Sequence, residues 1–222
     1  MTAIDSRRPR TAARLPVRAL LRALLDGDDE AANDVVLGML GETGSRTAIF
    51  ADLLHPAQAE VGNLWYGGAV SSADEVRMAT AVRRIVSRLA PTPASRPVRQ
   101  GSRCIVAVPE GDPHDIGVTM LVLALQDHGW STELLGAHRG LLDVPELVVT
   151  RRPRLVCLSA GVLPPVALIE RVVASAHRAR VPVLVGGAAF NRLPHLVERV
   201  GADGLGTDVR VGVVLAQRLA GR

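Results

Sequence analysis

Lysine is absent from this chain, since all 26 basic residues are arginine. This absence excludes every chemistry that needs a lysine amine, including Schiff-base formation and the lysine clamp of phosphate-binding loops. Aromatic residues are also scarce, at 2% of the sequence. A core must therefore be built from Leu, Val and Ala, and we do not expect a nucleic-acid reader that stacks bases on aromatic side chains.

Cysteines are few, and long hydrophobic runs are missing. Cys104 and Cys157 each lie within a short apolar run, which predicts two core residues and excludes a disulfide framework or a zinc site. No run approaches the ~18 apolar residues of a membrane span. The arginine-rich start superficially resembles a transit peptide, but its apolar positions continue into the first predicted helix and no cleavage signal follows. We therefore expect a cytoplasmic protein without a membrane segment.

The composition that remains is typical of a globular protein. The 222 residues are 48% hydrophobic and 22% charged, enough for one large domain or two small ones. The formal charge of +4 is unevenly placed, because residues 1–22 carry six arginines against the single acid Asp5. We expect residues 1–14 to form a disordered basic arm. This arm is either a merely solvated tail or a contact for nucleic acid or an acidic partner.

The chain divides into two unlike halves at residues 91–102, a Pro-, Ser- and Arg-rich segment that we interpret as a linker. Before it, apolar residues recur at helical spacing and predict a four-helix bundle over residues 15–90. The four predicted helices cover residues 15–26, 28–40, 45–66 and 71–89. The expected N-caps are Asp28, Ser45 and Ser71, and the expected stops are Gly27, Gly41 and the pair Gly67 and Gly68.

After the linker, short β-branched runs alternate with amphipathic stretches. The predicted strands cover residues 103–108, 131–136, 154–160, 181–187 and 201–206, and the predicted helices cover 115–129, 143–151, 164–179, 192–200 and 208–220. This alternation predicts the α/β class. Residues 103–222 should form a flavodoxin- or Rossmann-like five-stranded parallel sheet with helices on both faces. Ligands of such sheets bind beyond the carboxyl ends of the strands.

Three unusual loops are predicted at that edge. They are the segment Asp112-Pro-His114-Asp-Ile-Gly117, the segment Ser159-Ala-Gly161, and the pair Gly186 and Gly187. Each has an ordinary explanation alone, as turn-forming or loop residues. Their joint spacing, with residues 118–158 before Ser159 and residues 162–185 before Gly186, resembles the signature of the cobalamin (vitamin B12)-binding domain family. That signature is D-x-H-x-x-G, then S-x-L or S-x-T, then G-G; Gly161 departs from it.

The resemblance implies a role for each residue of these loops. His114 would be the lower axial cobalt ligand in place of the cofactor's own benzimidazole, since imidazole ligates cobalt well. Asp112 would hold the second ring nitrogen, with Asp115 as a competitor. Glycines would leave room for the displaced nucleotide tail, and a serine would bond its benzimidazole nitrogen. The residues concerned are Gly117, Gly186 and Gly187 for the tail and Ser159 for the nitrogen.

The helical half indicates which branch of the family is present. Trp65 and Glu75 match the W-x9-E-H motif of light-responsive adenosylcobalamin regulators, in which these two side chains cover the adenosyl group. The structural alternative is a core tryptophan and a glutamate favoured by the dipole of the helix that Ser71 caps. The histidine of the motif, which becomes the new cobalt ligand after light, is Val76 here. Because residues 1–14 leave no helix-turn-helix head, we do not expect sequence-specific DNA binding.

Two functions from different classes follow, and a regulatory module is favoured over an enzyme. The first is a cobalamin-dependent sensor of light or cofactor supply that acts through a protein partner or homo-oligomer and favours adenosylcobalamin. The second is a corrinoid carrier that delivers a methyl group from methylcobalamin with a separate methyltransferase. A flavodoxin-like domain that has lost its cofactor is the third interpretation.

The other polar candidates are weaker. His55 should lie on a different helix face from Trp65, because the two are ten positions apart in the sequence. Glu110 could line the pocket. The remaining histidines have no metal-like spacing and are expected at the surface: His128, His138, His177 and His195.

Overall fold

The computed structural model describes residues 14–90, 102–136 and 140–221. It divides the chain into two compact units, Met1–Leu89 and Ala90–Arg222, and each is described by itself below. Residues 1–13 of the predicted arm, residues 91–101 of the predicted linker and His138 lie outside the described residues. None of the helices in the described ranges is long and apolar enough to cross a bilayer.

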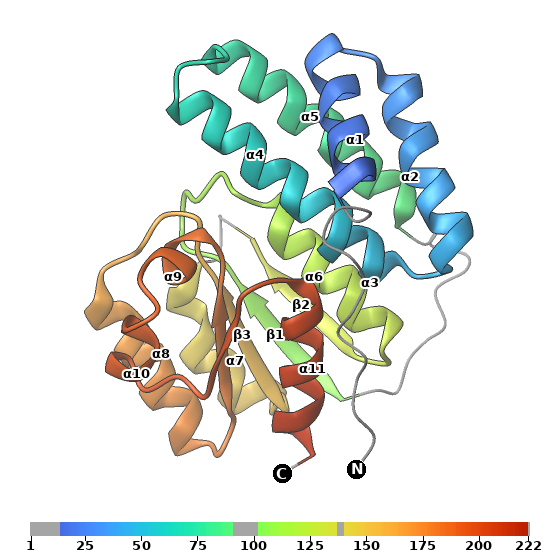
Figure 1. Ribbon diagram of the computed structural model, residues 1–222. Helices are drawn as coiled ribbons and strands as arrows, with labels where there is room; N and C mark the ends of the chain where they lie inside the picture. The colour runs from blue at the N-terminus through green and yellow to red at the C-terminus, as the bar shows by residue number, and fades with distance from the viewer. Residues whose placement is uncertain (1–13, 91–101, 137–139, 222) are drawn as a thin grey trace. The chain divides into compact units, whose positions relative to one another are not determined.

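The first unit is helical, and helices occur at all four stretches that the apolar periodicity indicates (Figure 1). They are α1 (Arg14–Asp26), α2 (Asp29–Thr43), α3 (Arg46–Ile49), the π-helical turn η1 (Phe50–Leu54), α4 (His55–Tyr66) and α5 (Ser72–Leu89). The elements α3, η1 and α4 follow one another without a break, so the predicted helix 45–66 is one rod with a π-helical turn inside it. Its buried side chains include Phe50, Leu53 and Leu54, which are 0% exposed.

The predicted helix starts are confirmed, and one predicted stop is wrong. The side chains of Asp28, Ser45 and Ser71 each accept a hydrogen bond from the backbone N–H three residues later. Helix α2 continues through Gly41, since an isolated helical glycine costs only about 1 kcal/mol. Gly44 ends α2 instead. It has the left-handed φ of 61° and its N–H donates to the Leu40 carbonyl at 2.8 Å.

The second unit is a five-stranded, all-parallel sheet in the order β2-β1-β3-β4-β5, as predicted for the α/β class (Figure 1). The strands are β1 (Arg103–Ala107), β2 (Ser131–Leu135), β3 (Leu155–Ser159), β4 (Val183–Gly186) and β5 (Gly204–Gly206). The helical segments are α6 (Ile116–Asp127), η3 (Leu141–Asp143), α7 (Val144–Arg151), α8 (Val166–Arg178), α9 (Ala188–Arg192), α10 (Leu196–Arg199) and α11 (Val209–Ala220).

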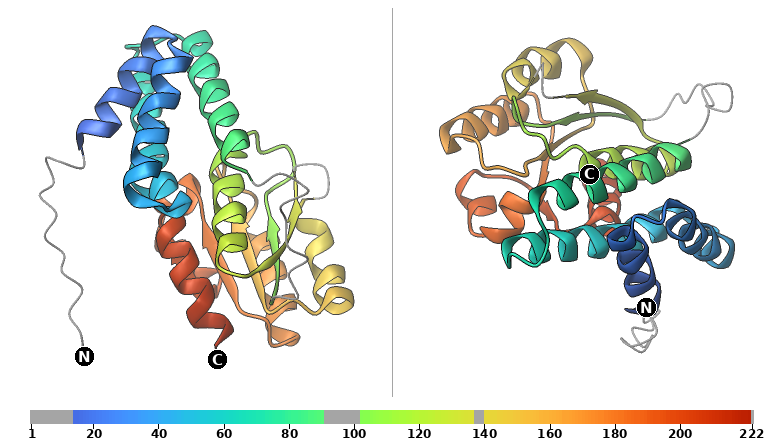
Figure 2. Two further views of the ribbon diagram at one scale, coloured as in Figure 1. Left: turned by 90° about the vertical axis from the view of Figure 1, so that its right-hand side faces the viewer. Right: turned by 90° about the horizontal axis from the view of Figure 1, so that it is seen from above.

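Helices cover both faces of this sheet (Figure 2). Val183 and Val185 belong to the buried cluster that also holds residues of α7 and α8. Leu184 points the other way, because side chains alternate along a strand, and lies near Leu215 of α11 beside Gly204. On that second face α11 packs against α6, where Leu121 approaches Gly212. The two faces are therefore covered by α7 and α8 on one side and by α6 and α11 on the other.

Two details of the second unit bear on the sequence predictions. Cys104 and Cys157 are buried free thiols with their Sγ atoms 3.7 Å apart, which confirms them as core residues. Burial raises the pKa of Cys104 well above its ordinary value. The short helix expected near residues 192–200 is present as α10 (Leu196–Arg199), but it begins later than predicted. The preceding helix α9 (Ala188–Arg192) ends before Pro194, which interrupts the helical backbone.

Candidate functional site

The three loops singled out in the sequence meet at the carboxyl edge of the sheet. The β1–α6 loop, the β3–α8 loop and the β4–α9 loop follow neighbouring strands, and Ser159 pairs in register with Gly186. Because all strands are parallel, their carboxyl ends lie at one edge. The sheet therefore brings the predicted site residues of the second unit together.

Asp112 ties two of these loops to each other. Its Oδ1 accepts hydrogen bonds from His114, at 3.0 Å from the backbone N–H and 2.7 Å from ring Nδ1. Its Oδ2 accepts from the backbone N–H groups of Gly161 (2.6 Å) and Val162 (3.2 Å) in the next loop. The sequence analysis missed these two amides as partners. Only the position of Gly161 in the motif hinted at them, and nothing in the sequence marked Val162.

Four donors around one buried carboxylate set its protonation. Burial of the Asp112 side chain, which is 2% exposed, would by itself raise its pKa. The hydrogen bonds from His114, Gly161 and Val162 outweigh that effect and hold the pKa of Asp112 below its ordinary value. Asp112 is therefore ionised at neutral pH and accepts hydrogen bonds at both of its oxygens.

This arrangement determines which ring nitrogen of His114 is free. A carboxylate only accepts, so Nδ1 of His114 must donate to Asp112. In the neutral ring Nε2 then carries the lone pair. The side chain of His114 is 60% exposed, so this nitrogen is accessible to a ligand. An imidazole with one nitrogen fixed by a carboxylate and the other free is the arrangement that metal-binding histidines use.

Gly161, where the sequence departs from the family signature, lies directly beside the ring of His114 in the structure. A Cβ atom at Gly161 would overlap Cγ, Nδ1 and Cβ of His114. The imidazole thus lies across the glycine, in the space that the Leu or Thr of the family pattern would occupy. Because glycine has no side chain, Gly161 leaves room for the ring of His114 to reach Asp112.

The other glycines differ in what surrounds them. A Cβ at Gly186 would lie 2.8 Å from the Gly206 carbonyl oxygen of β5. Gly187 has φ 89° and its Cβ would collide with the Ala160 backbone. Both are therefore required by close backbone approach. Gly117 instead has open space at its Cβ position, and Ser159 is half-buried at the end of β3.

The first unit carries Trp65 and Glu75 near the turn between α4 and α5. The Trp65 side chain donates from Nε1 to the Ser72 hydroxyl at 3.1 Å, and its ring lies 4.9 Å from that of Tyr66. Trp65 is 41% exposed, which excludes its interpretation as a core tryptophan. Glu75 is half-buried, and Val76 is 60% exposed.

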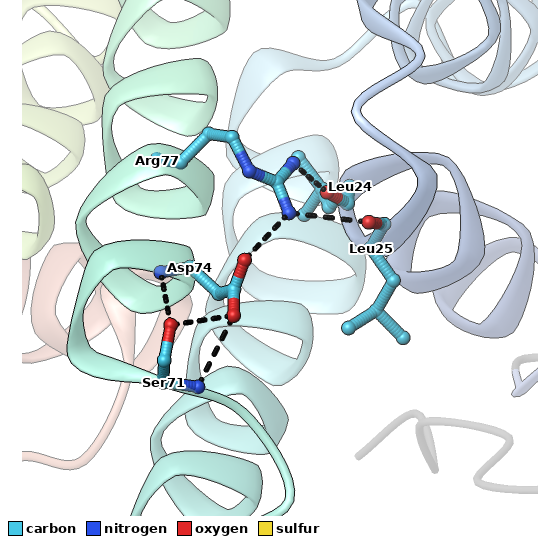
Figure 3. Close-up of polar contacts among 5 residues, drawn as sticks. All are labelled: Leu24, Leu25, Ser71, Asp74 and Arg77. Atoms are coloured by element: carbon cyan, nitrogen blue, oxygen red, sulfur yellow. Dashed lines mark hydrogen bonds and ion pairs between the residues drawn. The ribbon is translucent and has the colours of Figure 1, made fainter.

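The start of α5 is anchored to the end of α1 (Figure 3). Ser71 and Asp74 cap each other, since Ser71 Oγ accepts from the Asp74 N–H and the Asp74 carboxylate accepts from the Ser71 N–H and hydroxyl. Arg77 bonds the same carboxylate and donates to the carbonyls of Leu24 and Leu25. The hydrogen bonds from Ser71, then Arg77, lower the pKa of Asp74. These contacts fix the first turn of α5, from which Glu75 and Val76 project.

The weaker candidates have unremarkable surroundings. His128, His177 and His195 are exposed, as predicted. His55 is the first residue of α4, and the exposed Glu110 packs its Cγ against Gly140. None of these residues forms a hydrogen bond or ion pair with His114 or Asp112 in the described part of the chain.

Comparison with known proteins bears on the family and the fold. A sequence model described as the B12 binding domain matches residues 102–214, and a second B12 binding domain model matches residues 17–90. The structure is similar to the monomethylamine corrinoid protein of Methanosarcina barkeri, with a TM-score of 0.76 and 20% identity, covering 93% of this chain and 99% of that one. This likeness supports the fold.

Among curated sequences, two repressors of Myxococcus xanthus are similar to this chain. CarH, an HTH-type transcriptional repressor, is 30% identical over 68% of this chain and 50% of its own length. CarA, of the same type, is 32% identical over 48% of this chain and 35% of its length. An uncharacterized 20.5 kDa protein from the bchF-crtJ intergenic region of Rhodobacter capsulatus is 27% identical over 46% of this chain and 55% of its own length. The chain thus spans at most about half of these relatives. Since the first model covers half of the sequence and its loops form one site, the chain belongs to the B12-binding domain family.

Proposed function

We propose that this cobalamin-binding protein is a sensor that takes up adenosylcobalamin with His114 as the lower axial cobalt ligand and acts through a protein partner or its own oligomer. The observation that carries the proposal is the imidazole of His114, which is bonded through Nδ1 to a buried carboxylate and exposes Nε2. The residues at this edge suit the cofactor, because His114 offers one exposed nitrogen ligand and the space at the Cβ position of Gly117 is open.

In this proposal Asp112 tunes the ligand as well as orienting it. An ionised carboxylate on Nδ1–H makes Nε2 a stronger donor and keeps the ring from rotating. Asp112 itself is held by the Gly161 and Val162 amides. The orientation of the ring is therefore fixed by the loops that follow both β1 and β3. When bound, cobalamin supplies a cobalt ion whose upper ligand is exchangeable.

The displaced nucleotide tail would enter beside Gly117, where the space at the Cβ position is open, with Ser159 as a hydrogen-bond partner. Gly186 and Gly187 contribute indirectly. Their backbones pack closely against Gly206 and Ala160, and this shapes the edge of the sheet next to the tail.

The first unit would provide the cover for the upper ligand through Trp65 and Glu75. Two features support this role: Trp65 is too exposed to be a core residue, and the capped start of α5 holds Glu75 in a defined place. The similarity to two transcriptional repressors supports a regulatory role. The signal in this proposal is light or cofactor supply.

The test uses the full chain. We would add adenosylcobalamin in the dark, remove the free cofactor and record the visible spectrum before and after green light. His114→Ala should lose the spectrum of the histidine-ligated form, whereas His195→Ala, which removes an exposed histidine elsewhere, should retain it. A light-induced change in oligomer or partner binding supports the sensor. Failure of the wild-type chain to retain any cobalamin would refute the proposal.

A second function, a corrinoid methyl carrier that works with a separate methyltransferase, is favoured by Val76. The light-responsive motif has a histidine at this position, and an exposed valine cannot ligate cobalt after the upper ligand leaves. Retention of methylcobalamin but not adenosylcobalamin would support this carrier and contradict the sensor.

A further inference from the structure

A groove lies at the amino edge of the sheet, opposite the edge that carries the His114 loops. Its volume is about 820 Å³. It is formed where α7, α8 and α11 end and the chain enters β3 and β4, near the end of α11 in Figure 1. None of its lining residues belongs to the loops around His114. The groove is therefore separate from the site proposed above.

The lining is strongly basic. Arg152, Arg154 and Arg180 contribute three guanidinium groups, against the one lining carboxylate of Asp203. That carboxylate is already engaged, since it accepts from the Val183 N–H at 2.7 Å and lies 2.9 Å from Nε2 of His177. Arg154 donates one hydrogen bond to a backbone carbonyl of α11. Within the described residues, Arg152 and Arg180 have no ion pair or side-chain hydrogen bond, so their charges are available.

The backbone at these two arginines is unusual. Arg152 (φ 48°) and Arg180 (φ 59°) are the non-glycine residues with positive φ in the described ranges, and both follow helices that end at the groove. Glycine is the ordinary residue in this left-handed position. The chain itself follows that rule after α1, α2, α4, α6 and α10, where Gly27, Gly44, Gly68, Gly129 and Gly201 have positive φ. At the groove it places two arginines where glycine would be less strained.

We propose that this groove binds a phosphorylated small molecule. Guanidinium groups bind phosphate oxygens through paired hydrogen bonds, and two of them here have no partner within the described chain. Apolar side chains, including Val148, Val181 and Leu219, also line the groove and suit an organic portion of the ligand. The volume is in the range of small-molecule sites, about 300–1,000 Å³. Both arginines have a strained backbone conformation, and such strain is often found at binding sites.

The test is isothermal titration calorimetry of the full chain with ATP, inorganic triphosphate and, as an uncharged control, adenosine. Both phosphates should bind and adenosine should not. Arg180→Gly should weaken ATP binding about tenfold or more, because it removes charge-assisted hydrogen bonds to phosphate. Arg180→Lys keeps the charge but loses the planar fork, so we expect an intermediate affinity. Arg171→Gln removes one exposed charge of α8 away from the groove and should leave the affinity unchanged.

The glycine variant also protects the test against misfolding, since glycine suits a positive φ and should leave the thermal unfolding temperature equal or higher. Three results would overturn the proposal. They are the absence of phosphate binding by the wild type, equal losses in Arg180→Gly and Arg171→Gln, and tighter binding of duplex DNA than of ATP. None depends on whether cobalamin binds.

Discussion

The substitution Asp112→Asn tests the link between the two loops of the cobalamin site. The carboxylate accepts two hydrogen bonds at each oxygen, from His114 at Oδ1 and from Gly161 and Val162 at Oδ2. Asparagine has the same shape, but one of its two positions is an NH₂ group. Either orientation of the amide therefore turns an NH₂ group toward N–H donors that were bonded before.

The loss can be estimated from those contacts. Two charge-assisted hydrogen bonds disappear, and each buried N–H left unpaired costs about 1–3 kcal/mol. The NH₂ group faces either the donors of His114 or those of Gly161 and Val162, so we expect the local stability of the loop on that side to fall by about 2–4 kcal/mol. This corresponds to an increase of roughly thirtyfold or more in local opening.

Amide hydrogen exchange is the suitable assay, because the chain has two units and a single global unfolding free energy is poorly defined. Either the backbone N–H of His114 or the N–H groups of Gly161 and Val162 should exchange roughly thirtyfold faster or more in Asp112→Asn than in the wild type. Glu110→Gln removes an exposed carboxylate of the same loop and should leave these rates unchanged. Equal exchange in the wild type and Asp112→Asn would refute the reasoning.

The pH dependence follows from the lowered pKa of Asp112. A carboxyl group whose folded pKa is depressed contributes stability above its unfolded pKa, and that contribution disappears as the pH falls through the folded pKa. The difference in local stability between the wild type and Asp112→Asn should therefore have its full size at neutral pH. It should shrink only below the ordinary value of 3.8. A difference that vanishes well above that value would contradict the assignment.

Three further substitutions test single contacts. Gly161→Thr should push the ring of His114 off its position, and long-range ¹H–¹⁵N NMR should then show loss of the Nδ1–H form that the wild type has. Gly187→Ala should destabilise the second unit by about 2 kcal/mol or more in urea unfolding, because φ is positive and Ala160 blocks the added methyl group. Ser71→Ala removes the cap of α5 and should cost about 1 kcal/mol of the first unit's stability. A loss below about 0.3 kcal/mol would contradict that role.

Much of the fold could be predicted because the strongest sequence signals are local. Apolar periodicity located all four helical stretches of the first unit, and caps such as Asp28 act through a residue only three positions away. Interruptions of the helices were harder to predict. The π-helical turn at Phe50–Leu54 leaves the apolar pattern almost unchanged, and the break at Pro194 was overlooked within a short apolar stretch.

The candidate site was predictable in its residue types but not in its contacts. The spacing pointed to Asp112 and His114, and parallel strands place their loops at one edge. That Gly161 accommodates the imidazole, and that two backbone amides hold the carboxylate, depends on how the β1–α6 loop meets the β3–α8 loop. No local pattern encodes this long-range contact, so only the structure shows it. The groove with Arg152 and Arg180 was missed for the same reason.

The most direct test of the account is electron paramagnetic resonance of cob(II)alamin bound to protein whose histidines are labelled with ¹⁵N. If Nε2 of His114 is the lower ligand, the superhyperfine pattern should change from triplets in unlabelled protein to doublets in labelled protein. The change should be absent in His114→Ala and present in His195→Ala. Triplets in the labelled wild type would show that the cofactor's own benzimidazole remains on cobalt, and would contradict the central claim.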